Sequence, residues 1–348
     1  MNPRPATPAR PDRFGPRRAV VALGLLSLLA LLSLVLACLA GSVAVPLADM
    51  PAAFGELLGG GMRHLDATLL GLRLDRAATA FVTGGSLALA GAMMQALLRN
   101  PLADPYVLGI SGGAAVGALA SLLFGLAAWV TDLSALGGAL LISALLYLLA
   151  RRDLRSGVAL DGGTSLLLLT GVILSSGCMA LVTLMLSIAP ESRLRGMVFW
   201  MIGDLSGGTF RMLPALLLAG GLIFALRLAR AINVMALYAD AAATLGVPVG
   251  RLRQALFACS GLLTASAVTS AGSIGFVGLI VPHAVRFALG PDHRLLLPAS
   301  MLAGGAFLVV ADTVARTLLA PQQLPVGVIT AMIGVPVFLI QLHQLRRR

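Results

Sequence analysis

Long apolar runs dominate this sequence and leave few polar stretches between them. Of the 348 residues, 58% are hydrophobic and only 11% are charged. A water-soluble fold of this composition would lack the charged side chains that normally cover a protein surface. A helix of about 20 apolar residues is long enough to cross a lipid bilayer. The sequence therefore predicts an all-α polytopic membrane protein with about ten transmembrane helices.

The apolar runs divide the chain into a short tail and one transmembrane domain. Residues 1–18, rich in proline and arginine, are expected to form a cytoplasmic tail, and residues 19–348 the domain. Two less apolar segments, 45–70 and 190–209, are interpreted as external, the first of them as a loop. Expected helices cover residues 19–40, 72–98, a segment containing Gly109, Gly113 and Gly117, then 133–150, 164–188, 212–228, 252–271, 276–289, 295–319 and 326–345.

The basic residues indicate how the domain lies in the membrane. All 25 are arginines, and the net charge is +11. They cluster at the ends of the apolar runs, so the charge is not that of a nucleic-acid surface. With ten spans, most of them fall on the side that holds both termini. Because cytoplasmic loops carry an excess of basic residues, we expect both termini in the cytoplasm.

Several kinds of chemistry have no support in the sequence. The chain contains no lysine, so it cannot contain a phosphate-binding loop of the G-x-x-x-x-G-K-[ST] type. Its four histidines and three cysteines are scattered, without the spacing of a metal site or a disulfide framework. We therefore predict no enzyme activity, no metal and no cofactor bound by this chain.

Charged residues within the apolar runs are few. Asp312 and Arg316 are four residues apart, a spacing that allows an ion pair on one helix face. No chain of carboxylates suggests a proton relay. This disfavours a stand-alone secondary transporter of a small solute, which remains the alternative, and an intramembrane enzyme has even less support.

The segment 231–253 is the longest weakly apolar interruption in the second half of the chain. Arginines flank it on both sides, which suits a cytoplasmic loop. Within it, residues 239–245 can form a short helix that Gly246 ends, with Pro248 just beyond. Such a helix could dock against a partner, or it could be an ordinary connection.

Six motifs follow one another in the sequence. They are GAMMQALLRNPLADPYVLGISGGAAVG (91–117), AxxLGV (242–247), GSIGFVGLIVPHAVR (272–286), GPDHRLLLP (290–298), ADTVAR (311–316) and LPVGVITAMIGVPVF (324–338). From about residue 70 to the C-terminus, the chain resembles the permease subunits of type II ABC importers for iron–siderophores, haem and cobalamin.

The resemblance implies a fold, a function and a set of partners. Members of this family have ten helices with both termini inside, and two copies usually surround one pathway. By analogy, the chain would be a permease of the bacterial inner membrane, importing an iron chelate or cobalamin by alternating access. A cytoplasmic ATPase dimer would bind ATP and Mg²⁺, a periplasmic protein would deliver the substrate, and a homodimer is expected. The motifs do not distinguish among the substrates.

The resemblance also assigns candidate site residues. Thr164 and Ser165 resemble a polar pair at the cytoplasmic gate, although they could equally cap a helix. The family pattern L-R-L-P-R reads L-R-L-D-R here, with Asp75 in place of the proline. Contacts with the binding protein are assigned to Arg73, Arg76 and Arg316. Contacts with the ATPase are assigned to Ala239, Asp240, Ala242, Leu245, Gly246 and Val247.

Overall fold

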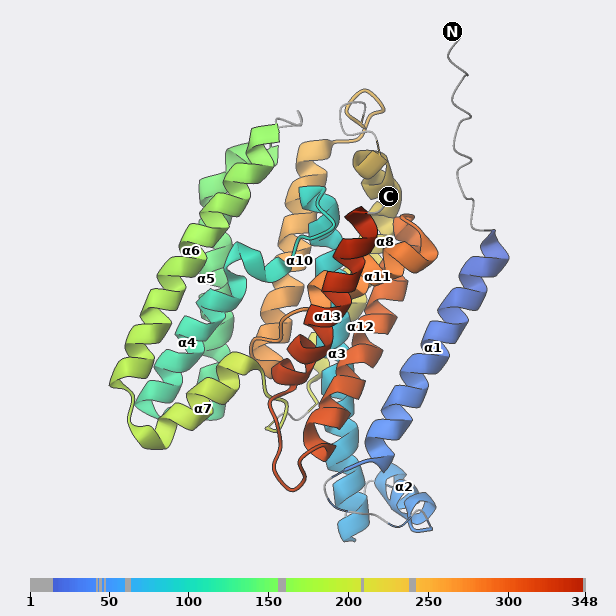
Figure 1. Cartoon of the computed structure of the whole chain (residues 1–348), viewed down its shortest axis with the longest axis vertical. Coiled ribbons are helices and arrows are strands. Elements are labelled where there is room, and N and C mark those ends of the chain that lie inside the picture. Colours follow the sequence, from blue (N-terminus) through green and yellow to red (C-terminus); the bar gives the residue numbers. More distant parts are fainter. Residues whose placement is uncertain are drawn as a thin grey trace.

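A computed structural model describes residues 15–41, 43, 46, 48–59, 64–155, 161–207, 210–237 and 242–346. Within these residues all regular structure is helical, as predicted (Figure 1). The elements are α1 (Pro16–Leu39), α2 (Met50–Leu58), α3 (Leu65–Leu98), the 3₁₀ helix η1 (Pro105–Leu108), α4 (Ile110–Phe124), α5 (Ala128–Arg155), α6 (Asp161–Ile188), α7 (Glu191–Ile202), α8 (Met212–Leu237), α10 (Val249–Ala271), α11 (Val277–Leu289), α12 (His293–Thr317) and α13 (Val326–Arg346).

Seven of the described helices are long and apolar enough to cross a membrane. Three shorter apolar helices accompany them, at Ile110–Phe124, Val277–Leu289 and Val326–Gln341. Together they correspond to the ten predicted spans. The two shortest, Ile110–Phe124 and Val277–Leu289, do not need full membrane length, because irregular backbone at membrane depth is tolerated when protein surrounds it.

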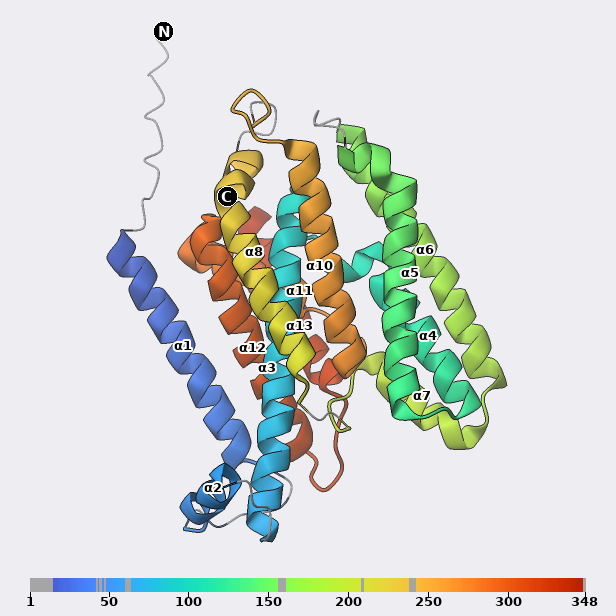
Figure 2. The same ribbon diagram turned by 180° about the vertical axis from the view of Figure 1, so that it is seen from behind.

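Helix α3 lies at the centre of the bundle, where α1, α8, α10, α11 and α12 contact it (Figures 1 and 2). Of its most apolar 18-residue stretch, 89% is buried inside the protein. Small residues allow neighbouring backbones to approach closely. A Cβ atom added to Gly91 would lie 1.9 Å from the carbonyl oxygen of Gly278 in α11, and one added to Gly84 would lie 2.3 Å from that of Gly304 in α12.

Glycines also join α4 to α5. A Cβ atom on Gly113 would lie 2.4 Å from the carbonyl oxygen of Gly138, and one on Gly117 would lie 1.9 Å from that of Ser134. These two glycines therefore let α4 pack closely against α5. Gly109 differs, because it precedes α4 with φ of +81° and ends η1. Helix α4 therefore begins one residue after Gly109, which the expected helix had included.

The two segments interpreted as external are more helical than predicted. Residues 45–70, expected to be a loop, include α2 and the first residues of α3. Helix α3 starts at Leu65 rather than near Leu72, and it passes through Asp75 without a break. A proline at that position would remove a backbone hydrogen bond and crowd the preceding turn. Aspartate does neither, so the helix extends further. In the second segment, residues 191–202 form α7.

Helix α1 begins, and α13 ends, at the same end of the bundle (Figure 1). We call this the arginine-rich end and the opposite one the α2 end. The predicted tail, residues 1–18, lies almost wholly outside the described residues. The described arginines in or next to the helix turns at the arginine-rich end are Arg17, Arg18, Arg99, Arg151, Arg152, Arg155, Arg227, Arg230, Arg251, Arg253, Arg286, Arg294 and Arg346.

The Gly91–Gly278 contact leads to a first prediction. Gly91→Ala should destabilise the protein by about 1–3 kcal/mol or more, because α3 and α11 must separate to admit the methyl group. The measurement is thermal unfolding in detergent. Gly177→Ala is the matched control, since nothing lies within 4 Å of the added Cβ in α6. Equal melting temperatures for the two variants would contradict the proposed packing.

Candidate functional site

The connection between α8 and α10 is shorter than predicted. The expected loop 231–253 is wrong at both ends, because α8 continues to Leu237 and α10 begins at Val249. Arg227 and Arg230 do not end α8, since arginine is a good helix former and basic side chains suit a helix C-terminus. Ala239 and Asp240, two of the candidate ATPase contacts, lie outside the described residues.

The remaining candidates form a capped turn, residues 242–247, which we call the α8–α10 turn. Gly246 has φ of +80°. Its N–H donates to the carbonyl of Ala243 at 3.1 Å, and the N–H of Val247 donates to that of Ala242 at 3.0 Å. These two hydrogen bonds and the positive φ form a helix C-terminal cap, which was expected at Gly246. Ala242 is buried, whereas the side chain of Leu245 is 63% exposed. The turn thus offers an apolar side chain between two long helices at the arginine-rich end.

Thr164 and Ser165 lie in the first turns of α6, which begins at Asp161. Their side chains lie outside the part of the chain that the structure describes. The gate assignment therefore stays a prediction.

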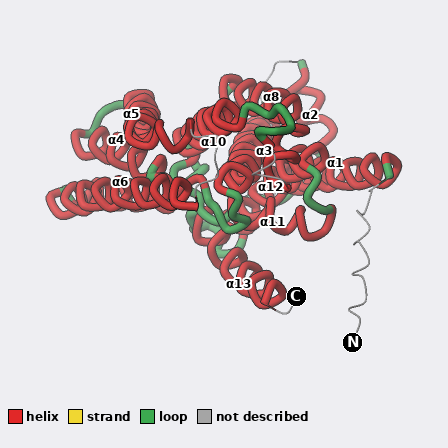
Figure 3. The backbone as a smooth tube through the Cα atoms, turned by 90° about the horizontal axis from the view of Figure 1, so that it is seen from above, coloured by secondary structure: helices red, strands yellow, loops and turns green. Residues whose placement is uncertain are grey.

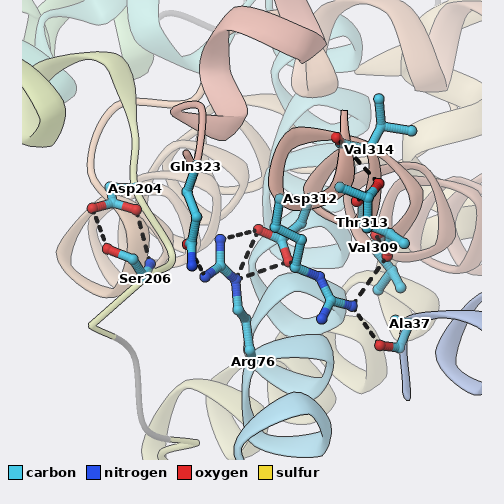
Figure 4. A network of polar contacts seen from close by, with 11 residues as sticks. Ala37, Arg76, Asp204, Ser206, Val309, Asp312, Thr313, Val314 and Gln323 are labelled. Atoms are coloured by element: carbon cyan, nitrogen blue, oxygen red, sulfur yellow. Dashed lines mark hydrogen bonds and ion pairs between the residues drawn. The ribbon is translucent and has the colours of Figure 1, made fainter. Parts of the chain in front are cut away.

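A network of buried charges lies at the α2 end and joins α3 to α12 (Figure 4). The Nε atom of Arg76 donates to both carboxylate oxygens of Asp312 at 3.0 Å, and a terminal nitrogen donates to one of them at 2.8 Å. Another donates to Gln323 at 2.8 Å. Arg316 Nε lies 3.6 Å from Asp312 Oδ2, and Arg316 also donates to the carbonyl of Ala37 in α1. The ion pair predicted from the 312–316 spacing is present.

Arg73 belongs to the same end of the bundle and is also buried. Its guanidinium donates to the carbonyls of Cys38 at 3.0 Å and Leu39 at 3.2 Å, and to that of Val43. The carbonyls of Cys38 and Leu39 belong to the last turn of α1, where a helix leaves acceptors unpaired, and that of Val43 follows the helix. Arg73 therefore ties the end of α1 to α3.

The three arginines assigned to docking thus lie close together. Their N–H groups, however, donate hydrogen bonds to other residues of this chain. Arg73 and Arg316 are 7% and 5% exposed. The sequence placed them at the external side of the membrane, in contact with a binding protein. It did not reveal that Asp312 pairs with Arg76, which precedes it by 236 residues. No spacing rule could have found that pair. Contact with a binding protein through these arginines remains a prediction.

Near the same end, Glu56 of α2 interacts with His64, which precedes α3. The carboxylate accepts the backbone N–H of His64 at 3.1 Å, and its other oxygen lies 2.7 Å from Nδ1 of the ring. This hydrogen bond, and then the charge of Glu56, raise the pKa of His64 above its ordinary value. The pair thus fastens α2 to the start of α3 while the ring is protonated.

Comparison with known proteins places the chain in a family. Residues 28–344 match the FecCD transport family. The chain belongs to the FecCD transport family. It is 40% identical over 326 residues to the vitamin B12 import system permease protein BtuC of Shigella boydii serotype 18, with 92% of this chain and 94% of the relative covered. BtuC of Escherichia coli O9:H4 is 39% identical over 326 residues, with the same shares covered.

Solved structures agree with this family assignment. A transporter assigned to the metal-chelate ABC type, in an inward-facing conformation, superposes with a TM-score of 0.79 at 30% identity, covering 93% of this chain and 99% of that one. PsaBC from Streptococcus pneumoniae, in complex with Fab, has a TM-score of 0.52 at 18% identity, covering 84% and 95%. The second likeness concerns the fold alone. The predicted permease fold and the resemblance are confirmed, and this FecCD member is membrane-embedded and belongs to a transport family rather than an enzyme family.

The buried network predicts a large cost for losing its carboxylate. Asp312→Asn should destabilise the protein by about 3–5 kcal/mol, because it leaves two buried arginines without a counter-charge. Asp132→Asn is the control, since its partner Arg211 is 45% exposed, and exposed pairs contribute about 0–1 kcal/mol. Thermal or denaturant unfolding in detergent measures both. Similar losses in the two variants would contradict the account.

The Glu56–His64 pair predicts a pH effect. Because its pKa is raised in the folded state, His64 stabilises the attachment of α2 below its ordinary pKa. That contribution is lost as the pH rises through the raised value. Glu56→Gln should lower the pKa of His64 toward its ordinary value, as measured by NMR of the labelled imidazole. An unchanged pKa would show that the two side chains do not interact.

Proposed function

We propose that this chain is the membrane permease of an ATP-driven importer for cobalamin or a related metal chelate, in the bacterial inner membrane. The observation that carries the proposal is the 40% identity, along nearly the whole chain, to a vitamin B12 import permease. The structural likeness to a metal-chelate type ABC transporter supports the wider substrate class. Iron–siderophores and haem belong to that class.

The energy would come from ATP and Mg²⁺ bound by a separate cytoplasmic ATPase dimer. The positive-inside rule assigns the arginine-rich end to the cytoplasm. At that end, the α8–α10 turn presents Leu245 between α8 and α10. A movement of the ATPase against this turn would displace both α8 and α10. We therefore assign ATPase coupling to the turn and to the preceding Ala239 and Asp240.

Substrate would move by alternating access between two copies of the chain. Helices α6 and α13 flank one side of the bundle (Figure 3). Facing helices of two copies would enclose an apolar pathway. Weak contacts between the chelate and the walls of this pathway would let a bulky substrate be released. Thr164 and Ser165 would narrow this route at its cytoplasmic end. Exposed large side chains on α6 and α13 include Leu166, Leu169, Ile173, Met332, Leu339 and Ile340.

A periplasmic binding protein would deliver the substrate at the α2 end. Arg73, Arg76 and Arg316 hold α1, α3 and α12 together there. We assign to them the shaping of the docking surface, with Arg76 at its rim, where it meets Gln323. Salt-dependent docking that weakens in Gln323→Ala, with stability unchanged, would support this surface.

The test of the coupling assignment is purification of the tagged chain in mild detergent, with the stoichiometry of a retained ATPase measured. Leu245→Asp should abolish retention, because it puts a charge on the exposed apolar contact. Gly246→Val should reduce it as well, since a β-branched residue opposes φ of +80°. Gly246→Asn is the matched control, because asparagine tolerates this conformation.

Two outcomes would overturn the assignment. The first is full retention of the ATPase in Leu245→Asp and Gly246→Val. The second is a wild-type chain that purifies without any ATPase from its native host.

A further inference from the structure

A cavity of about 490 Å³ opens at the arginine-rich end. Helices α3, α8 and α11 end beside it, and α12 begins there. It lies apart from α6 and α13, which flank the proposed route. Side chains from four helices line it, among them Gln95, Arg99, Asn233, Arg286 and His293. None of them has a part in the proposed transport mechanism.

Two unpaired cations line this cavity. Arg99 is exposed and Arg286 is partly buried, and neither side chain has a hydrogen bond or ion pair within the described part of the chain. Among the described lining residues, Asp292 is the one carboxylate. Its Oδ1 already accepts from Asn233 at 2.7 Å and from the N–H of Arg294 at 3.0 Å. The start of α12 adds the positive end of a helix dipole. The cavity therefore favours an anion.

Two buried acceptors accompany the cations. The Nδ1 atom of His293 lies 2.7 Å from Oδ1 of Asn233, which can only accept, so Nδ1 carries the proton. In the neutral ring Nε2 is then an acceptor, and it has no partner among the described residues although His293 is only 3% exposed. Gln95 Nε2 donates to the carbonyl of Leu279 at 3.1 Å, and Gln95 Oε1 accepts from none of the residues that the structure describes. Both acceptor atoms are covered in this conformation, and a buried acceptor without a partner is costly, so each favours a small side-chain movement toward a donor from a ligand in the cavity.

These observations specify the ligand more closely than charge alone. Arg99 and Arg286 need anionic oxygens, whereas His293 and Gln95 need a hydroxyl. A carboxylate from a partner protein would supply the first and not the second. We propose that this cavity binds a phosphate group that carries or adjoins a hydroxyl. The headgroup of phosphatidylglycerol and free hydrogen phosphate both have this chemistry.

The test uses the full chain, stripped of lipid in detergent. Native mass spectrometry with phosphatidylglycerol or phosphatidylethanolamine, and thermal shift with inorganic phosphate, separate a lipid source from a free one. One retained phosphatidylglycerol per chain, not displaced by phosphate, indicates the lipid. Stabilisation by phosphate in lipid-free protein indicates the free anion. Glycerol phosphate should bind more tightly than dimethyl phosphate, which has no hydroxyl.

Arginine substitutions test whether the phosphate group binds in this cavity. Arg286→Gln should weaken the binding about tenfold or more, because it removes a charge-assisted hydrogen bond. Arg99→Gln, on an exposed residue, should weaken it without affecting folding. Arg230→Gln is the matched control, an exposed arginine of α8 that does not line the cavity.

Equal binding in the three variants would overturn the proposal. So would binding of neither phosphatidylglycerol nor phosphate to the wild-type chain. Loss of ATPase retention in Arg286→Gln, with no phosphate binding to the wild type, would instead assign the cavity to a protein contact.

Discussion

Close backbone contact between α3 and the helices around it organises this membrane protein. Lipid gives no hydrophobic force that would press one apolar helix against another, so packing must come from shape. Gly84 and Gly91 let α12 and α11 approach until only glycine fits. Because protein surrounds α3, the neighbouring helices can be short or interrupted, as α11 and the η1–α4 segment are.

The two ends of the bundle are built differently around this centre. At the α2 end, carboxylate and carbonyl groups satisfy the arginines, so α1, α3 and α12 are fixed to one another. At the arginine-rich end, two arginines that line a cavity have no partner among the described residues, and the α8–α10 turn exposes Leu245. The first end suits a rigid scaffold that shapes the proposed docking surface, and the second suits contact with the proposed ATPase and the proposed anion.

The sequence predicted the features that depend on local pattern. Apolar length indicated the spans, Gly246 indicated the end of the helical turn before α10, and the spacing of Asp312 and Arg316 indicated their ion pair. It could not predict the pairing of Arg76 with Asp312, because charges far apart in the chain follow no local rule. It also stopped α8 too early and started α3 too late, since Arg230 and Asp75 are compatible with continued helix. The cavity at His293 depends on four helix ends meeting, which no single segment reveals.

Reconstituted transport tests the central claim, that this FecCD permease imports a chelate with energy from a separate ATPase. Vesicles would contain the chain alone or the chain with its ATPase, and the binding protein would be loaded with labelled cobalamin or a ferric siderophore. The account predicts uptake only when the ATPase and ATP are both present on the side of the arginine-rich end. Uptake by the chain alone, without ATP, would contradict it and favour a secondary transporter.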